Sequence, residues 1–345
     1  MMIGCRTRID PQGGVVMVEP KGGWLMRELG LALLLQATAS CAGAKEPPYH
    51  LIPGAVPLEK GPDGNSIVLN APDGLIVVDT GRHPAHSKAI LDFAKERGRP
   101  IAAIVNSHWH MDHTTGNADI RAVYPRAEVY QSNAVDGALE TFLADGRKNA
   151  EVRLKDPKTP PERLPEVRRF LDRMDHPDSI RPTRPITASA RMKIAGRSLD
   201  VHLAKFAATE GDVWLYDPKA RLVIVGDLVV DIVPFMDTAC ADGWLKALGE
   251  IERTPFAALI PGHGPVMTRA DFVTWKTAFA AFVDCGRSTA PKEKCVAGWE
   301  TGAAQFIDKA HRDYVHEAAD YYLTTRLRSS PEQQQLYCKP LKPKA

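Results

Sequence analysis

The sequence has 345 residues, of which 44% are hydrophobic and 25% are charged, and its formal net charge is +2. These values are typical of a globular protein with enough chain for a sizeable core, and they exclude a wholly disordered chain. A nearly balanced charge gives no reason to expect nucleic acid as a partner.

The N-terminal segment has the layout of a secretory signal peptide. A charged stretch that begins at Met26 precedes the apolar run 29–35, and small residues follow as far as Ala44. The apolar run is too short for a permanent membrane span. We interpret residues 1–44 as an upstream extension (1–25) plus a signal peptide. The alternative, a buried helix in a cytosolic protein, is disfavoured by the abrupt change in composition.

Two processing routes are open. Ala42-Gly-Ala44 fits a cleavage site ahead of Lys45, whereas Thr38-Ala-Ser-Cys41 resembles a lipobox that would leave an acylated Cys41. Threonine is a weak residue at the first lipobox position, so we favour plain secretion. We therefore expect a periplasmic or secreted protein, anchored to the envelope by lipid only if the second route operates.

The first half of the mature chain alternates strand and helix signals. Two β-branched runs flank the turn Ala71-Pro-Asp-Gly74 and predict a hairpin, and the continuous apolar run 101–105 predicts a strand buried on both faces. In chain order, we predict strands over 65–69 and 75–79, a helix over 87–97, a strand over 101–105, a helix over 116–123 and a strand over 127–131.

Residues 133–184 break this alternation. They are dense in charges of both signs and are interrupted by prolines, which predicts solvated helices in an insertion. Beyond it we predict strands over 186–194, 199–203, 213–216, 221–227 and 257–260, and helices over 244–250, 269–283 and 301–327. The last helix has an apolar residue at every fourth position from Phe306 to Tyr322. We expect one domain over 45–290, which includes the insertion, and a C-terminal helical extension over 291–345.

Six cysteines are present, and none forms a Cys-x-x-Cys pair that would indicate a cysteine zinc cluster. Cleavage ahead of Lys45 leaves four cysteines, an even number suited to an oxidising compartment. Cys285 and Cys295 flank a loop-like segment and could pair, which would leave Cys240 for Cys338. The sequence alone permits three connectivities.

The residues that follow strand 101–105 form a metal-binding pattern. His108, His110, Asp112 and His113 lie within six positions, directly after the buried strand. Imidazole and carboxylate together suit Zn²⁺, and also iron or manganese. A polar loop with incidental histidines is the alternative, but chance placement of four such residues here is improbable.

Four motifs together resemble the metallo-β-lactamase superfamily. They are Asp79-Thr-Gly81, the cluster His108-x-His110-x-Asp112-His113, Gly226-Asp227 and Pro261-Gly-His263-Gly, and the resemblance covers roughly residues 51–282. It implies an α/β fold, a four-layer αββα sandwich with its metal site at one edge of the two sheets.

The resemblance also implies two ligand sets. In that family His108, His110 and a third histidine hold one metal; Asp112, His113 and His263 hold the other; and Asp227 bridges them. The third histidine normally precedes a segment like Thr209-Glu-Gly-Asp212, but Ala208 stands there. Only the second set is complete. Glu210 or a water could fill the first set, whereas His202 fits a sheet residue better. We therefore expect one or two metal ions per chain.

Such a metal activates water and polarises the bond under attack, so we predict a secreted metal-dependent hydrolase of a small molecule. Asp112 and Asp227 are the expected catalytic residues, which would orient the water. An ester, lactone, β-lactam, amide or phosphoester is open as the substrate. Glutathione thioester hydrolysis ranks lower because, in the family, it depends on the histidine replaced by Ala208. The alternative is a catalytically degenerate protein that keeps the fold and binds a metal or ligand.

Overall fold

The computed structural model describes residues 8–9, 15–16, 47–54 and 61–340. The chain divides into two compact units, residues 1–46 and 47–345. In the first unit, the short strands β1 (Arg8–Ile9) and β2 (Val15–Val16) pair antiparallel. The predicted signal peptide and both cleavage sites lie outside the described residues. No helix in the described part of the chain is long and apolar enough to cross a membrane.

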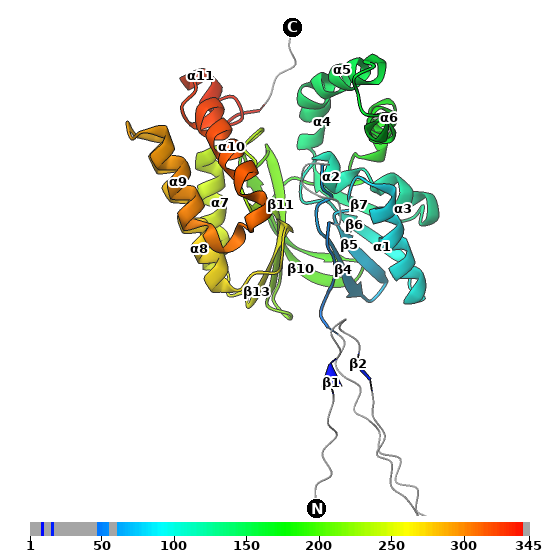
Figure 1. The fold of residues 1–345 in the computed structure, drawn as a ribbon. Coiled ribbons are helices and arrows are strands. Elements are labelled where there is room, and N and C mark those ends of the chain that lie inside the picture. The colour runs from blue at the N-terminus through cyan, green and yellow to red at the C-terminus, as the bar shows by residue number, and fades with distance from the viewer. Residues whose placement is uncertain (1–7, 10–14, 17–46, 55–60, 341–345) are drawn as a thin grey trace, which may run out of the picture. The chain divides into compact units, whose positions relative to one another are not determined.

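The first large sheet of the second unit has six strands in the order β3-β4-β5-β6-β7-β8 (Figure 1). The predicted hairpin forms β4 and β5, and β5 to β8 run parallel to one another. The strand bounds are β3 (His50–Ile52), β4 (Ser66–Ala71), β5 (Gly74–Val78), β6 (Ile101–Val105), β7 (Glu128–Ser132) and β8 (Arg184–Ile186).

The second sheet has five strands in the order β13-β12-β11-β10-β9, and only β12 and β13 are parallel. The strands are β9 (Ala190–Ile194), β10 (Arg197–Lys205), β11 (Gly211–Asp217), β12 (Leu222–Val230) and β13 (Ala258–His263). The predicted single strand 186–194 is therefore wrong. Its first residue is the last residue of β8 in the first sheet, and its last five residues form β9 in the second sheet. Residues between them leave both sheets, and Ser189 Oγ there accepts a hydrogen bond from the backbone N–H of Leu203.

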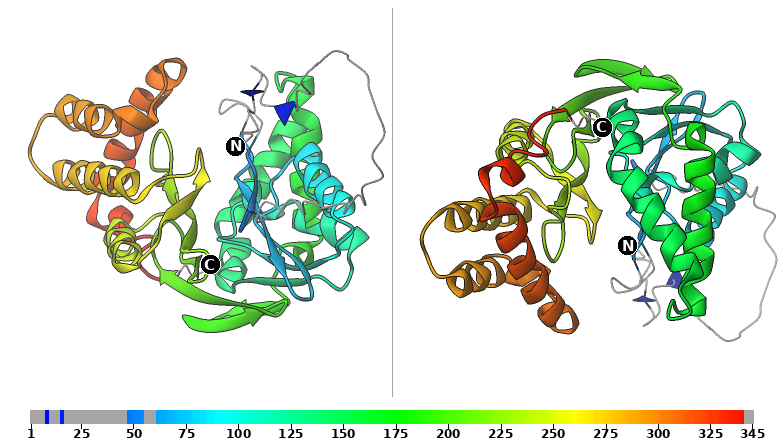
Figure 2. Two further views of the ribbon diagram at one scale, coloured as in Figure 1. Left: turned by 90° about the horizontal axis from the view of Figure 1, so that it is seen from below. Right: turned by 90° about the horizontal axis from the view of Figure 1, so that it is seen from above.

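The two sheets pack face to face, and helices cover their outer faces (Figure 2). One apolar core, with Val78, Val105 and Ile224, fills the space between the sheets. A second joins the first sheet to α1 (Pro84–Glu96) and α3 (Asn117–Val123), and a third joins the second sheet to α7 (Ala241–Arg253) and α8 (Arg269–Arg287). This arrangement confirms the predicted αββα sandwich.

The predicted helical insertion lies between β7 and β8. It contains α4 (Ala134–Glu140), α5 (Phe142–Lys155), a short 3₁₀ turn (Pro161–Arg163), α6 (Leu164–Asp175) and a second 3₁₀ turn (Pro177–Ser179). Its small core includes Val135, Leu143 and Ile180 packed around Trp109, which stands between two histidines of the metal motif. The insertion therefore packs directly against the histidine motif. The short helix α2 (Met111–Thr114) is part of the same motif.

The C-terminal extension is helical but not one long helix. The predicted helix 301–327 is wrong, because α9 (Lys292–Gly302) ends where 3₁₀ turns begin, and α10 (Arg312–Tyr322) starts anew. The carboxylate of Asp308 accepts hydrogen bonds from the backbone N–H groups of Ala310 and His311 and so begins a new helical segment. A π-helical turn (Leu323–Leu327) and α11 (Pro331–Gln334) follow.

Two disulfides join this extension to the domain, Cys240 with Cys338 and Cys285 with Cys295. Both expected pairs are confirmed. The first spans 98 residues and ties the end of the chain to the loop after β12, whereas the second spans only 10 residues and links α8 to α9.

The two disulfides should contribute unequally to stability. In the chain-entropy account, a cross-link that closes about 100 residues stabilises by about 4.7 kcal/mol, and one that closes about 15 residues by about 3 kcal/mol. We expect Cys240→Ser with Cys338→Ser to lower the free energy of unfolding more than Cys285→Ser with Cys295→Ser. Denaturant unfolding of both double variants measures this difference, and an equal loss would contradict it.

Candidate metal centre

The candidate site lies where strands of both sheets end. Asp79 follows β5, the histidine motif follows β6, Asp227 lies within β12 and His263 ends β13. Because the parallel strands of each sheet end at the same edge, segments from residue 79 to residue 263 meet there. The edge thus gathers four of the motifs noted in the sequence.

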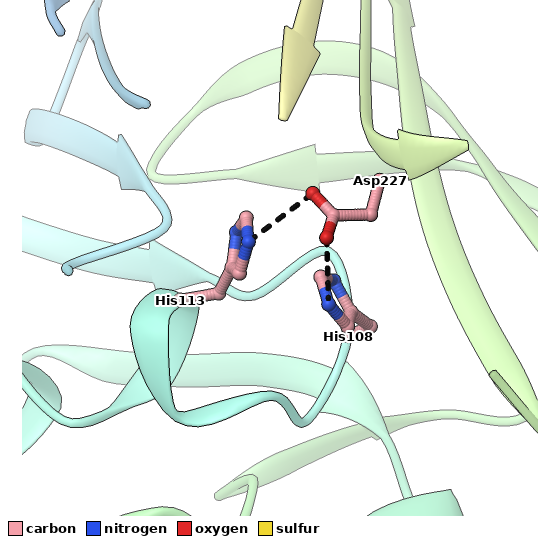
Figure 3. A group of neighbouring side chains, drawn as sticks. All are labelled: His108, His113 and Asp227. Carbon is pink, nitrogen blue, oxygen red and sulfur yellow. Dashed lines mark ion pairs between the residues drawn. The ribbon is translucent and has the colours of Figure 1, made fainter. Parts of the chain in front are cut away.

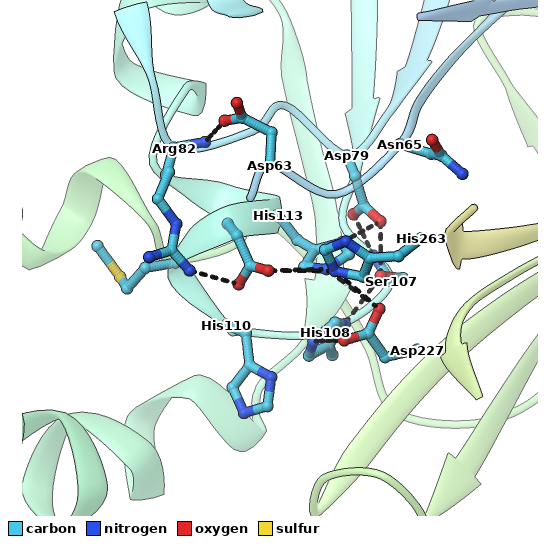
Figure 4. A network of polar contacts seen from close by, with 12 residues as sticks. Asp63, Asn65, Asp79, Arg82, Ser107, His108, His110, His113, Asp227 and His263 are labelled. Carbon is cyan, nitrogen blue, oxygen red and sulfur yellow. Dashed lines mark hydrogen bonds and ion pairs between the residues drawn. The ribbon is translucent and has the colours of Figure 1, made fainter. Parts of the chain in front are cut away.

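Asp79 is the residue that orders the histidines (Figure 4). Its carboxylate accepts hydrogen bonds from the backbone N–H of Ser107 at 2.7 Å, from Ser107 Oγ at 2.6 Å and from His113 Nδ1 at 2.8 Å. Because the Ser107 hydroxyl proton goes to Asp79, Ser107 Oγ accepts from His108 Nδ1 at 2.9 Å. Both histidines therefore carry a proton on Nδ1 and turn Nε2 toward the centre.

His108, His113 and Asp227 face one another at this centre (Figure 3). His108 Nε2 lies 3.6 Å from Asp227 Oδ2, and His113 Nε2 lies 3.2 Å from Asp227 Oδ1. Neither Nε2 atom nor Asp227 Oδ1 has an aligned hydrogen-bond partner among the described residues, although all three atoms are buried. Buried polar atoms without such partners are rare, and their convergence fits a bound cation.

Asp112 and His263 form a second group with His113. His263 Nε2 lies 3.2 Å from Asp112 Oδ2, and His113 Nε2 lies 3.6 Å from the same oxygen. One ligand atom from each of the three residues lies within 4.8 Å of the other two, as is also true of His108, His113 and Asp227. The two groups share His113, so the site offers two neighbouring sets of donors.

Arg82 and the insertion support Asp112 from outside. Arg82 Nη2 lies 3.4 Å from Asp112 Oδ1, and Arg82 Nη1 donates to Glu166 Oε1 of α6 at 2.9 Å. Burial alone would raise the pKa of Asp112, but Arg82, His113 and His263 outweigh it and hold that pKa well below its usual value. Asp112 is therefore ionised at neutral pH.

The charges of the other groups follow the same balance between burial and neighbours. Burial lowers the pKa of His108 well below its ordinary value. Burial also opposes protonation of His113, but Asp227, Asp79 and Asp112 raise its pKa well above the ordinary value. Burial works against ionisation of Asp227, yet His113, His263 and His108 lower its pKa. A cation that binds here replaces protons on the histidines, because metal ligands must be deprotonated.

His110 does not join either group, which differs from the ligand set implied by the resemblance. Its Nε2 lies 3.1 Å from Thr238 Oγ1, and the Thr238 hydroxyl donates to the carbonyl oxygen of Ala208 at 3.0 Å. Thr238 must then accept from His110 Nε2–H, which leaves Nδ1 as the nitrogen with a free lone pair in the neutral ring. Figure 4 shows the His110 ring pointing away from His113 and His263.

The substitutes considered for the third histidine do not fill its place. His202 stacks on Trp214 with ring centroids 3.7 Å apart, as expected of a sheet residue. Glu210 belongs to neither group of metal-competent residues within the described chain, and its carboxylate lies beside Gly137 of α4. A water as the missing ligand stays a prediction.

Three contributors were missed in the sequence. Ser107 and Arg82 carried a signal, since both adjoin recognised motifs. Thr238 carried none, because it lies 128 residues from His110 in an irregular loop. Sequence spacing shows which groups could bind a metal, whereas Ser107, Arg82 and Thr238 orient such groups through hydrogen bonds and an ion pair that the sequence does not show.

A cavity of about 530 Å³ opens over this centre. His110, Asp112, Asp227 and His263 line one end of it. The insertion forms one wall through α5 and α6, and Phe235 and Tyr314 of α10 contribute from the other side. The metal-competent groups are therefore accessible to a small molecule.

The chain belongs to the metallo-beta-lactamase superfamily, whose family model matches residues 60–263. Two solved structures share its fold: a metallo-beta-lactamase family protein from Thermus thermophilus (16% identity, TM-score 0.54, 80% of this chain and 93% of that chain) and a sec-alkyl sulfatase (14% identity, TM-score 0.50, 75% and 47%). At these identities, the likeness shows the fold alone.

Among curated proteins, the chain is 38% identical over 228 residues to a linear primary-alkylsulfatase from Pseudomonas sp. strain ATCC 19151, covering 59% of this chain and 42% of that protein. It is 43% identical over 56 residues to a hydroxyacylglutathione hydrolase from Synechococcus sp. strain JA-3-3Ab, covering 16% of this chain and 22% of that protein. The chain thus spans less than half the length of these relatives. The superfamily supports a metal-dependent hydrolase.

A substitution at Gly262 can show whether the position of Asp227 matters for metal binding. A Cβ at Gly262 would lie 2.0 Å from Asp227 Oδ1 and 2.8 Å from the Asp227 backbone nitrogen, so no side chain movement alone could relieve the clash. We expect Gly262→Ala to displace Asp227 and to weaken zinc binding by about tenfold, as disruption of the groups around a metal typically does.

Gly298 is the matched control. It lies in α9 with nothing within 4 Å of an added Cβ, so Gly298→Ala should leave zinc affinity unchanged and stabilise the helix by about 0.5–1 kcal/mol. Competition with a chromogenic chelator measures zinc affinity in both variants. Equal affinity in Gly262→Ala and the parent would show that Asp227 takes no part in metal binding.

Proposed function

We propose that the protein is a metal-dependent hydrolase that cleaves an ester bond in a small molecule. The observation that carries this proposal is the convergence of buried, unpartnered donor atoms of His108, His113 and Asp227 at the floor of an open cavity. Converging imidazole and carboxylate donors of this kind suit a cation, and a cavity beside them gives a substrate access to it.

Zinc is the metal that we propose, at one or two ions per chain. One ion would be held by Asp112, His113, Asp227 and His263, the complete set of donors, and these nitrogen and oxygen atoms suit Zn²⁺. The other position is less complete. It has His108 and Asp227, and His110 could contribute to it only through Nδ1. When bound, such a metal activates water and polarises the bond under attack.

Asp112 and Asp227 are the proposed catalytic residues. Arg82 favours the ionised form of Asp112, and the histidines around Asp227 do the same for that carboxylate. Both residues line the cavity, where an ionised carboxylate can orient a water molecule by accepting a hydrogen bond from it. Asp79 and Ser107 keep His108 and His113 in the tautomer that leaves Nε2 unprotonated when the ring is neutral.

The relatives guide the choice of bond. The alkylsulfatase and the hydroxyacylglutathione hydrolases are named for cleavage of a sulfate ester and a thioester, respectively. The first matches much more of this chain, so sulfate esters rank above thioesters. Ala208, together with the hydrogen bond that occupies His110 Nε2, favours a second candidate: a protein that binds a metal or ligand without turnover.

Export to the periplasm or beyond is also proposed. The two disulfides support it, because such bonds persist in oxidising compartments. We expect the protein from its native envelope to begin at Lys45, or at an acylated Cys41. Mass spectrometry of the intact protein measures this, and a mature chain that still begins at Met1 or Met26 would contradict export.

Activity should depend on metal and on His263. We expect chelation to abolish hydrolysis of aryl, alkyl and sulfate esters, and zinc to restore it. His263→Ala should lower zinc content and activity together, because His263 completes one donor group. His202→Ala, a control outside the site, should alter neither. Zinc binding without turnover on esters, lactones, β-lactams, thioesters and phosphoesters would support the second candidate instead.

A further inference from the structure

The cavity continues well beyond the metal-competent residues, along one face of α5. Phe142, Gly146, Asn149, Ala150 and Arg153 line it, and their spacing of three to four residues places them on the same side of the helix. The first and the last lie eleven positions apart, which corresponds to about 16 Å of helix. The Phe142 ring lies 6.3 Å from that of His110, so this face leads away from the metal centre.

The middle of this trough is apolar. Leu143 and Ala150 of α5 and Val167 and Phe170 of α6 line it. Gly146 keeps the two helices close, since a Cβ there would lie 3.2 Å from the Phe170 ring. A chain of methylene groups or an aryl group would bury apolar surface here without leaving a polar group unpaired.

Arg153 stands at the far end of the trough and differs from the other arginines that line the cavity. Arg82 and Arg163 pair with Glu166, and Arg169 pairs with Asp119. Within the described residues, the exposed guanidinium of Arg153 has no hydrogen-bond or ion-pair partner. A free guanidinium is suited to an anionic oxygen group, especially a carboxylate.

We propose that the cavity binds an elongated substrate with an anionic group remote from the bond that is cleaved. Its reactive ester lies beside Asp112, Asp227 and His263, its apolar body lies against α5 and α6, and its terminal carboxylate pairs with Arg153. Arg153 is thus a specificity residue. This inference rests on the proposed hydrolase function and names the substrate class for it.

Matched esters test the proposal. The substrates are mono-4-nitrophenyl esters of linear dicarboxylic acids in increasing chain length, each compared with the 4-nitrophenyl ester of the monocarboxylic acid of equal length. We expect the zinc-loaded protein to show a lower KM for the dicarboxylic member at one range of lengths. Arg153→Ala should raise that KM three- to fivefold with kcat unchanged, a factor typical of an exposed ion pair. It should leave the monocarboxylic ester unaffected.

Two variants control for charge and folding. Lys155→Ala removes a positive charge from the same helix outside the cavity lining and should leave both KM values unchanged. Arg153→Lys should retain part of the preference, and 0.5 M salt should reduce it. Equal KM values for the paired esters, or equal effects of Arg153→Ala and Lys155→Ala, would overturn the proposal.

Binding separates this inference from the proposed function. Isothermal titration of the zinc-loaded protein with a linear dicarboxylate and the matching monocarboxylate needs no turnover. If no ester is hydrolysed but Arg153→Ala selectively weakens binding of the dicarboxylate, the hydrolase proposal fails, whereas the proposal that Arg153 binds a remote carboxylate is supported. If esters are hydrolysed without preference for the remote carboxylate, the trough proposal fails alone.

Discussion

The hydrogen bonds of the Asp79 carboxylate are the constraint on which the candidate centre depends. One side chain at the end of β5 orients His113 directly and His108 through Ser107. Asp79 itself has a left-handed backbone with φ of 59°, a conformation that costs free energy in a residue other than glycine. The bonds to Ser107 and His113 compensate for that strain. They also exclude the neutral tautomers of His108 and His113 in which Nε2 carries the proton, so that each neutral ring directs a lone pair toward the centre.

The elements outside the sandwich complete this edge from two directions. The insertion packs on Trp109 and reaches Asp112 through Glu166 and Arg82. From the other side, Tyr322 of α10 donates to Asp237 at 2.7 Å, and the Cys240–Cys338 disulfide holds the loop that contains Thr238. Thr238 in turn directs His110. Segments outside the sheets therefore line the cavity and orient side chains at the candidate metal centre.

Much of the fold follows from local pattern. The hairpin, the buried strand β6 and the alternation of strands with helices all form as predicted, because apolar periodicity is a short-range property of the chain. The failures occur where long-range contacts decide. Residues 186–194 form parts of two strands because each sheet needs an edge strand there. Residues 301–327 break after Gly302, where α9 ends, and the Asp308 side chain caps the helical segment that begins anew.

By itself, the sequence determined the superfamily, the αββα class and the residues able to bind a metal, whereas it left three disulfide connectivities open. These properties depend on which side chains are present and on their order. Only the tertiary structure decided that His110 turns to Thr238 while His108 and His113 turn to Asp227. It likewise placed Arg82 against Asp112 and aligned α5 with the cavity. The direction of a side chain depends on its hydrogen-bond partners, and here those partners come from segments up to 128 residues away.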